Sequence, residues 1–338
     1  MGVKMGELLE NKKFGKTFIL DGSYFLHRAL AVESVMNLRN SKGEGTGGIF
    51  GVLRMLLKEI SAQDRFPILV FDSGLAQRRL EVYPDYKHAS DPRDETILSP
   101  EEAKTDHMTQ YREQRNKLVN LLPMLGIPVV KIKGWEGDDL MYIISRLSYK
   151  STIVTDDKDL LQMLSSTCKV RRAMADKTIL CEEFLKEREF DTIEDFIWTK
   201  AICGDGSDNI TGCCQGVAEG SSNHLIKILR YYYEGNKFPE DEKELRELCD
   251  KLGCKYKKAF LNFDENIFKR NLQLVDLRLV ENDIDEQIVD SVIATISDCK
   301  SRINLFGAMK LLAEYEIKDF SASSMIEKVN SRYSKLFV

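Results

Sequence analysis

The sequence predicts an α/β fold, with a parallel, doubly wound sheet in the first half of the chain and an all-helical region after it. Short apolar runs alternate with segments of helical spacing up to about Phe196, and no strand signal follows that residue. Acidic residues stand at or just beyond the ends of the apolar runs. With 338 residues, 43% of them hydrophobic, the chain is long enough for one large or two smaller domains.

The predicted elements follow each other in alternating order. Apolar runs bounded by turn residues predict strands at 17–20, 67–71, 127–132 and 152–155. Apolar residues at helical spacing predict helices at 47–60, 108–125 and 138–147. A polar stretch from about 73 to 109 has no clear period, and a turn rich in Gly and Cys at 204–220 interrupts the later helices.

Composition excludes several classes of protein. No run approaches the roughly 20 apolar residues of a membrane span, and the charged N-terminal segment lacks an apolar signal core, so we expect a cytoplasmic protein. The eight cysteines include no Cys-x-x-Cys pair, which argues against zinc and favours free thiols. The net charge of −5 argues against a nucleic-acid binder, unless the acids are concentrated in a metal site whose cations reverse the local field.

The candidate functional residues are nine carboxylates. Four of them follow predicted strands, and the carboxyl ends of parallel strands line one crevice. The others complete the motifs E-x-D-D, D-x-D and G-D-x-x-D-N, the last of which is predicted to place its two acids on one helix face. The nine are Asp21, Asp72, Glu136, Asp138, Asp139, Asp157, Asp159, Asp205 and Asp208.

A divalent metal site is the interpretation that fits this pattern. Two carboxylates about 4 Å apart repel by about 4 kcal/mol at an effective dielectric of 20, and divalent cations remove that repulsion. Oxygen ligands favour magnesium or manganese, and two such ions can activate water and stabilise the leaving oxygen of a phosphodiester. Any one of these acids alone is more often a turn residue or a helix cap, so the prediction rests on their joint occurrence.

Six segments have the order and spacing of a known family. They are FILDGS (18–23), ILVFDS (68–73), YPDYK (83–87), GWEGDDL (134–140), TDDKDLLQML (155–164) and AICGDGSDNITGCCQGV (201–217). They resemble the 5′-nucleases, which include flap endonucleases and the exonuclease domain of bacterial DNA polymerase I. FKRNLQLVDL (268–277) further resembles the bacteriophage branch, the phage flap endonucleases and phage ribonuclease H. A phage-encoded chain is expected in the host bacterial cytoplasm.

The resemblance implies a PIN-like nuclease core with a helical arch, followed by a helix–three-turn–helix region. The segments expected on this basis are an N-terminal extension (1–16), the core (17–196, arch about 74–117), the helix–three-turn–helix region (197–285) and a C-terminal helical segment (286–338). The implied function is hydrolysis of phosphodiester bonds at 5′ flaps and ends of DNA or RNA–DNA, including removal of RNA primers in replication. The implied partners are such nucleic acids, with a sliding clamp or a single-strand-binding protein as candidates, and we expect a monomer and no membrane.

The resemblance also assigns roles to residues. Two Mg²⁺ ions are implied, with Mn²⁺ as a substitute. The first ion would be served by Asp21, Asp72, Glu136, Asp138 and Asp139, and the second by Asp157, Asp159, Asp205 and Asp208. Lys87 and Arg79 match the basic pair that contacts the scissile phosphate. Asp156 is expected to be a neighbour of the ligands and not a ligand.

Two departures from the family pattern affect the nucleic-acid contacts. The turn at 216–225 keeps Gly216 and Val217 but lacks the family's lysine and carries Glu219, so the duplex contacts are expected at Lys251, Lys255, Lys257 and Lys258. The arch interval 74–117 has eight Lys/Arg against nine Asp/Glu, so it is not a basic funnel.

Two other functions compete with this interpretation. A haloacid-dehalogenase-type phosphatase also begins with an Asp at a strand end, but it needs a nucleophilic Asp two residues earlier, where this chain has Ile19. A non-catalytic protein that binds branched DNA through a decayed nuclease fold is the second alternative. The presence of all nine carboxylates argues against decay.

Overall fold

The structure is a computed structural model that describes residue 9, residues 13–88 and residues 106–337. The chain divides into two compact units. The first comprises Met1–Ala76, Ser90–Ile179 and Val280–Val338, and the second Gln77–Ala89 and Leu180–Leu279. This division differs from the segments expected from the sequence, because residues 77–89 group with the later helices and the C-terminal residues with the sheet. Part of the expected arch, 89–105, lies outside the described residues.

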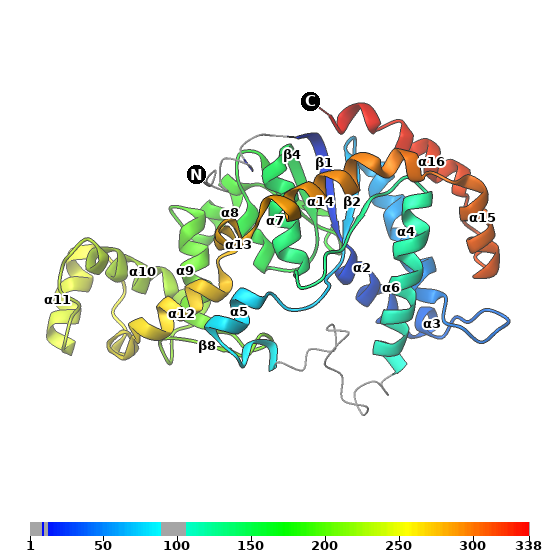
Figure 1. The fold of residues 1–338 in the computed structure, drawn as a ribbon. Coiled ribbons are helices and arrows are strands. Elements are labelled where there is room, and N and C mark those ends of the chain that lie inside the picture. The colour runs from blue at the N-terminus through cyan, green and yellow to red at the C-terminus, as the bar shows by residue number, and fades with distance from the viewer. Residues whose placement is uncertain (1–8, 10–12, 89–105, 338) are drawn as a thin grey trace. The chain divides into compact units, whose positions relative to one another are not determined.

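A six-stranded sheet in the order β3-β2-β1-β4-β5-β6 forms the centre of the first unit (Figure 1). Its strands are β1 (Phe14–Asp21), β2 (Phe66–Val70), β3 (Val129–Val130), β4 (Ser148–Val154), β5 (Cys168–Arg172) and β6 (Lys177–Ile179). All neighbouring pairs are parallel except β5 and β6, which are antiparallel. The predicted parallel α/β sheet is confirmed, but the sequence pattern did not predict β5 and β6.

The helices of the first unit supply the remaining core. Near the sheet they are α2 (Gly22–Leu30), α3 (Glu33–Met36), α4 (Gly47–Ala62), α6 (Asp106–Met124), α7 (Gly137–Leu147) and the 3₁₀ turn η3 (Asp159–Met163). The C-terminal ones are α13 (Val280–Asp283), α14 (Glu286–Ser297), η6 (Asp298–Arg302), α15 (Leu305–Glu314), α16 (Ala322–Asn330) and η7 (Tyr333–Lys335). The predicted helices at 47–60, 108–125 and 138–147 correspond to α4, α6 and α7. Since α7 packs on β1 and β4, its N-terminal turn lies at the strand ends that carry the acids.

The second unit is helical apart from one small ribbon. Its elements are α5 (Gln77–Val82), η1 (Tyr86–His88), α8 (Cys181–Arg188), α9 (Ile193–Cys203), α10 (Glu219–Tyr233), α11 (Glu242–Leu252), η4 (Lys258–Asn262), α12 (Glu265–Val275) and η5 (Leu277–Leu279). The ribbon pairs β7 (Gly204–Asp205) with β8 (Ile210–Thr211). The expectation of an all-helical region was therefore wrong at this point. Gly204, with φ 71°, ends α9 and turns the chain into the ribbon.

The C-terminal tail packs on the sheet. The backbone N–H of Gly15 donates to the Leu336 carbonyl at 2.7 Å, and the Leu336 side chain is fully buried. Leu336, the apolar residue at the centre of the C-terminal tail, therefore cannot contact a sliding clamp in this position. All eight cysteines are free thiols. None of the described helices has the length and apolar composition needed to cross a bilayer.

Candidate active site

Asp21 ends β1 and caps α2 at the same time. Its Oδ1 accepts a hydrogen bond from the backbone N–H of Tyr24 at 2.8 Å, and its Oδ2 accepts one from Oγ1 of Thr155 at 2.9 Å. An Asp at an N-cap satisfies one of the N–H groups that the start of a helix leaves unpaired. The Asp21 carboxylate is thus oriented by α2 and by the segment that follows β4.

Asp72 and Glu136 are held by backbone groups around the start of α7. The N–H of Gly137, the first residue of α7, donates to Oδ1 of Asp72 at 2.7 Å. The N–H of Ala76 donates to Oε1 of Glu136 at 3.1 Å, and Glu136 is buried. Carboxylates are favoured here because the helix dipole places partial positive charge at the N-terminus.

Asp138 and Asp139 both lie in the first turn of α7, in different surroundings. Asp139 is fully buried, whereas Asp138 is partly exposed. Adjacent helical residues point about 100° apart, so the two carboxylates do not face the same point. The greater exposure of Asp138 favours it as the direct ligand of an ion, and the assignment of both residues remains a proposal.

Asp157 and Asp159 form a short turn after β4. The N–H of Asp159 donates to Oδ1 of Asp157 at 2.8 Å, and the N–H of Asp157 donates to Oγ1 of Thr155 at 3.1 Å. Thr155 therefore connects Asp157 to Asp21, because its hydroxyl also donates to the Asp21 carboxylate. Sequence reasoning missed this role of Thr155, although the residue stands in the T-D-D-K-D segment.

The acids at the strand ends repel one another. Burial and the neighbouring Asp72 carboxylate raise the pKa of Asp21 to about 7, with a smaller contribution from Asp157. The carboxylates of β1, β2 and the segment after β4 are thus close enough to interact, as the sequence predicted for parallel strand ends. A divalent cation bound here would lower the pKa of Asp21 again, because it would stabilise the charged carboxylate.

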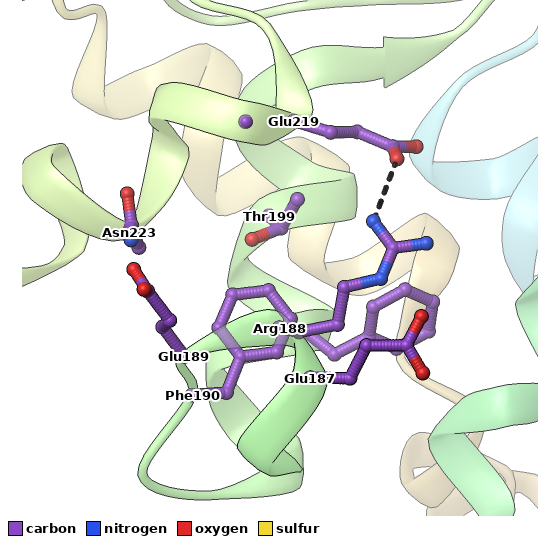
Figure 2. Close-up of a pocket in the computed structure, with 9 residues that line it drawn as sticks. Glu187, Arg188, Glu189, Phe190, Thr199, Glu219 and Asn223 are labelled. Atoms are coloured by element: carbon purple, nitrogen blue, oxygen red, sulfur yellow. Dashed lines mark ion pairs between the residues drawn. The ribbon is translucent and has the colours of Figure 1, made fainter. Parts of the chain in front are cut away.

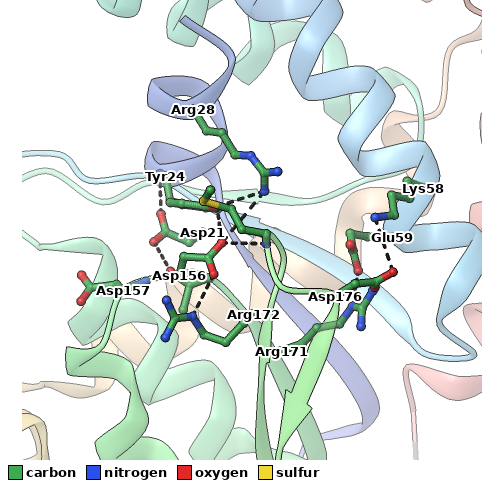
Figure 3. Close-up of polar contacts among 12 residues, drawn as sticks. Asp21, Tyr24, Arg28, Lys58, Glu59, Asp156, Asp157, Arg171, Arg172 and Asp176 are labelled. Carbon is green, nitrogen blue, oxygen red and sulfur yellow. Dashed lines mark hydrogen bonds and ion pairs between the residues drawn. The ribbon is translucent and has the colours of Figure 1, made fainter. Parts of the chain in front are cut away.

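Asp156 has a different environment from Asp157. Arg172 Nε donates to its Oδ1 at 2.8 Å, and the Tyr24 hydroxyl and the N–H of Met174 donate to its Oδ2 (Figure 3). Although burial raises the pKa of this carboxyl, these hydrogen bonds hold it below its usual range. With both oxygens engaged by protein donors, Asp156 is placed as the neighbour that the sequence predicted.

Asp205 and Asp208 lie in the second unit, on the β7–β8 ribbon and its turn, and not on a helix face as predicted. The Nζ of Lys200 lies 3.0 Å from Oδ2 of Asp205, and the N–H of Ser207 donates to Oδ1 at 2.9 Å. Burial raises the pKa of Asp205, but the bonds from Ser207 and Lys200 outweigh it and hold this pKa below its usual range. Asp205 is therefore kept as a carboxylate anion.

Lys87 lies beside Asp208 within the same unit. Its Nζ is 3.7 Å from Oδ2 of Asp208, and its backbone N–H donates to the Asp208 carbonyl at 3.0 Å. Lys87 has φ 51°, in the left-handed region that non-glycine residues rarely adopt. Tyr86 adds a third contact, because its hydroxyl donates to Oδ2 of Asp208 at 3.3 Å. The lysine is therefore fixed in position and not a freely moving surface cation.

Arg79 differs from its predicted role. Its side chain is only 3% exposed, and its Nε donates to the carbonyl of Leu274 at 2.9 Å. A direct contact with a phosphate would require this side chain to leave that position. Its observed contact joins α5 to the end of α12, which supports the segment that carries Lys87.

The residues expected to bind duplex lie in the second unit, in the turn before α10, near the end of α11 and in the segment that leads into η4. Gly216 has φ 86° and the N–H of Val217 donates to the Cys214 carbonyl at 3.2 Å, which forms a tight turn before α10. Glu219, the first residue of α10, lies 3.7 Å from Arg188, and both residues line a cavity of about 190 Å³ (Figure 2). Glu219 thus neutralises Arg188, a cation near the turn from which the family's lysine is missing.

The four lysines predicted to replace that contact differ in their surroundings. Lys251 Nζ lies 4.6 Å from the ring centre of Tyr231, and Lys258 pairs with Glu242 at 2.5 Å. Burial lowers the pKa of His224, and the positive charges of Lys255 and Lys257 contribute. Lys255 and Lys257 therefore lie near enough to His224 of α10 to act on its charge, whereas the charge of Lys258 is balanced by Glu242.

The carboxylates do not form a closed metal cage. Among the residues that the structure describes, no group of three or more His, Cys, Asp or Glu side chains converges closely enough to enclose an ion. The donor set nevertheless fits magnesium, which usually keeps several waters and uses one or two carboxylates. The raised pKa of Asp21 is the observation that points to a cation here.

The comparisons with known proteins agree with this geometry. Residues 16–190 match the family model described as the 5′-3′ exonuclease, N-terminal resolvase-like domain. The chain belongs to this 5′-3′ exonuclease family. It is accordingly an enzyme, a hydrolase of phosphodiester bonds in DNA, and the phosphatase and the non-catalytic alternatives are set aside.

Individual relatives extend the likeness beyond that domain. The 5′-3′ exonuclease of Aquifex aeolicus is 29% identical over 80% of this chain and 95% of its own length. The thermostable DNA polymerase I of Thermus thermophilus is 25% identical over 63% of this chain, which spans only 24% of that polymerase. The phage T5 D15 protein, crystallised with metal ions, has the same fold with a TM-score of 0.59, 23% identity, and coverage of 84% of this chain and 99% of that chain.

Proposed function

We propose that this exonuclease-family hydrolase is a structure-specific 5′-nuclease that cuts at 5′ flaps and ends. The observation that carries the proposal is the set of interacting carboxylates from β1, β2 and the segment after β4, next to the N-terminus of α7. The phage T5 D15 flap endonuclease, whose structure was solved with DNA and metal ions, supports it through a shared fold at a TM-score of 0.57 and 23% identity.

Divalent cations, Mg²⁺ or Mn²⁺, are the proposed cofactors. In the first unit the residues that would hold them are Asp21, Asp72, Glu136, Asp138, Asp139, Asp157 and Asp159. In the second unit, Asp205 and Asp208 of the G-D-x-x-D-N motif are proposed ligands. Bound ions of this kind supply an activated water and stabilise the leaving oxygen of a phosphodiester.

The chain's own residues orient these carboxylates. Thr155 fixes Asp21 and Asp157, Gly137 fixes Asp72, and Ala76 fixes Glu136 through hydrogen bonds. We assign to Lys87 the stabilisation of negative charge on the phosphate, because a fixed ammonium loses little energy in reorganising during the reaction. Arg79 supports the same segment through the Leu274 carbonyl.

The finer biological role follows from the same proposal. A nuclease that removes 5′ segments is suited to clearing RNA primers in replication, with RNA–DNA hybrids among its substrates. The segment at 268–277 favours an origin in the phage branch of the family. A sliding clamp and a single-strand-binding protein are the candidate protein partners, and the burial of Leu336 against β1 favours the second.

The proposal is tested by product sizing. Three substrates of equal length, a 5′-flap, a nicked duplex and an RNA–DNA hybrid with a 5′ end, are incubated with Mg²⁺ and the purified chain. We expect the main flap product to be cut at the junction and to be released as an intact oligonucleotide. Asp157→Asn is the control that should abolish this product. Mononucleotides as the first products from every substrate would show a simple end-directed exonuclease and overturn flap specificity.

A further inference from the structure

We propose that Arg28 and Arg172, held in place by Asp156, form a binding site for a phosphodiester group of the substrate strand beside the acids of the active site. The two arginines and Asp156 all belong to the first unit, and Figure 3 shows Asp156 between them. The inference rests on the DNA hydrolase activity of the family and adds a contact that the nine carboxylates do not provide.

Asp156 is a positioning residue in this arrangement. Its side chain is 10% exposed, and both oxygens accept hydrogen bonds, from Arg172 Nε at 2.8 Å and from the N–H of Met174 at 3.0 Å. The Tyr24 hydroxyl donates to the same carboxylate, and Arg28 Nη1 lies 4.0 Å from it. A carboxylate with four donors around it fixes two guanidinium groups that would otherwise sample many rotamers.

Tyr24 connects this cluster to the acids. Its hydroxyl donates to Asp156, while its backbone N–H donates to Oδ1 of Asp21 at 2.8 Å. Arg28 Nη1 in turn donates to the Tyr24 hydroxyl at 3.1 Å. The position of the arginines is therefore tied to the position of Asp21 through a single residue.

Both arginines keep donors for a ligand. Among the residues that the structure describes, the Nη1 and Nη2 groups of Arg172 and the Nε and Nη2 groups of Arg28 have no protein acceptor. The side chains are 35% exposed for Arg28 and 26% for Arg172. With one carboxylate between two guanidinium groups, the cluster keeps one positive charge, and the planar guanidinium fork matches two oxygens of a phosphate.

The first experiment measures binding in Ca²⁺, so its result does not depend on where the enzyme cuts. The probe is a hairpin DNA with a 5′ single-stranded extension, in versions with one phosphate replaced by a neutral methylphosphonate. For the unmodified chain we expect about a tenfold loss of affinity at one or two adjacent positions. Arg172→Ala should bind the unmodified DNA with an affinity lowered by the same factor, and its salt slope should flatten by about one unit. A methylphosphonate at those positions should then cause no further loss of affinity in this variant.

A matched control removes a positive charge from β5, the protein strand that carries Arg172. Lys169 is an exposed lysine on β5, and Lys169→Ala should respond to every methylphosphonate as the unmodified chain does. If Arg172→Ala is as sensitive to each methylphosphonate as the unmodified chain, Arg172 contacts no phosphate and the site is overturned. Arg172→Lys should recover part of the affinity, because a lysine keeps the charge but not the fork.

The second experiment tests the role of Asp156. Asp156→Asn removes a negative charge and releases the arginines, so DNA affinity in Ca²⁺ should stay equal or rise while the single-turnover rate in Mg²⁺ falls by about tenfold. Asp156→Glu should recover part of that rate. If Asp156→Asn only lowers the melting temperature, with rate and affinity unchanged, the cluster is a structural link between α2 and β5 and the proposal fails.

Discussion

The ammonium of Lys87 lies 3.7 Å from Oδ2 of Asp208, and the backbone N–H of Lys87 donates to the carbonyl of the same residue. A proposed catalytic cation and a proposed metal ligand are thus held together by one side-chain and one main-chain interaction. A substitution of one of these residues is therefore expected to disturb the position of the other.

Lys87→Ala should lower the single-turnover cleavage rate by about a hundredfold or more, because a fixed positive charge near the reacting phosphate is removed. Affinity for DNA in Ca²⁺ should change little, and Lys87→Arg should restore only part of the rate. Lys243, an exposed lysine on α11, provides the control, since Lys243→Ala should cleave normally. A defect of Lys87→Ala that lies wholly in affinity would remove Lys87 from the chemistry.

Metal ions should control activity. Mg²⁺ and Mn²⁺ are expected to support cleavage, whereas Ca²⁺ should support DNA binding without turnover, because it is larger and more flexibly coordinated than Mg²⁺. The measurement is product formation after dialysis against EDTA and readdition of each ion. Undiminished cleavage in EDTA would rule out the metal proposal.

The metal-free protein should become less stable as the pH rises through the range in which Asp21 titrates. The folded pKa of Asp21 is about 7, above its ordinary value of 3.8, so the unfolded chain releases this proton first. The contribution of Asp21 to the free energy of unfolding is fully present below about pH 4 and is lost as the pH rises towards 7. The stability of Asp21→Asn should match that of the unmodified chain near pH 4 and exceed it above pH 7 by on the order of 4 kcal/mol, since Asn still caps α2.

Thermal or urea unfolding in EDTA at several pH values measures this difference. Asp290→Asn, at an exposed position on α14, is the control and should show no comparable dependence on pH. A stability difference between Asp21→Asn and the unmodified chain that is the same at pH 4 and pH 8 would contradict a pKa of Asp21 raised by burial and by Asp72.

Duplex binding should depend on the lysines near α11. Replacing Lys255 and Lys257 by Ala should weaken duplex binding and flatten its salt slope by about one unit for each phosphate that the protein no longer neutralises. Glu219→Gln is the informative partner variant, because it frees Arg188 and should strengthen binding if the duplex reaches that turn. An unchanged slope in the double lysine variant would place the duplex elsewhere.

A buried ion pair gives a stability prediction that is independent of function. Arg171 Nε lies 2.7 Å from Oε2 of Glu59, and the two side chains are 9% and 3% exposed. Glu59→Gln should lower the free energy of unfolding by about 3 kcal/mol, because a buried guanidinium is deprived of its main counter-charge. The neighbouring Lys58→Ala, which breaks a surface pair with Asp176 but leaves the contact between Asp176 and Arg171, should change it by about 0.5 kcal/mol or less. Equal effects of the two changes would mean that Arg171 is compensated by other groups.

The sequence predicted the sheet and the position of its acids well, because strand ends and turn residues are local signals. The antiparallel edge strands escaped prediction, since Cys168–Arg172 is short and carries three cations. The burial of Arg79 could not be predicted either, because its hydrogen-bond partner is the carbonyl of Leu274, far along the chain. Asp156 was expected to be a neighbour of the ligands, but its donors come from α2 and β5, which no local pattern connects.

The order of the strands has a consequence for how the enzyme is made. β1 lies between β2 and β4, so Thr17 pairs with Phe66 on one side and with Ser151 on the other. Such distant pairings form late in folding, because the loops they close are long and the entropy of closing them must first be overcome. Asp21, Asp72 and Asp157 lie at or just after the ends of β1, β2 and β4, so they come together only when these three strands have paired. A nascent or partly unfolded chain therefore lacks the proposed metal site, so we expect cleavage of DNA to begin only after these strands have paired.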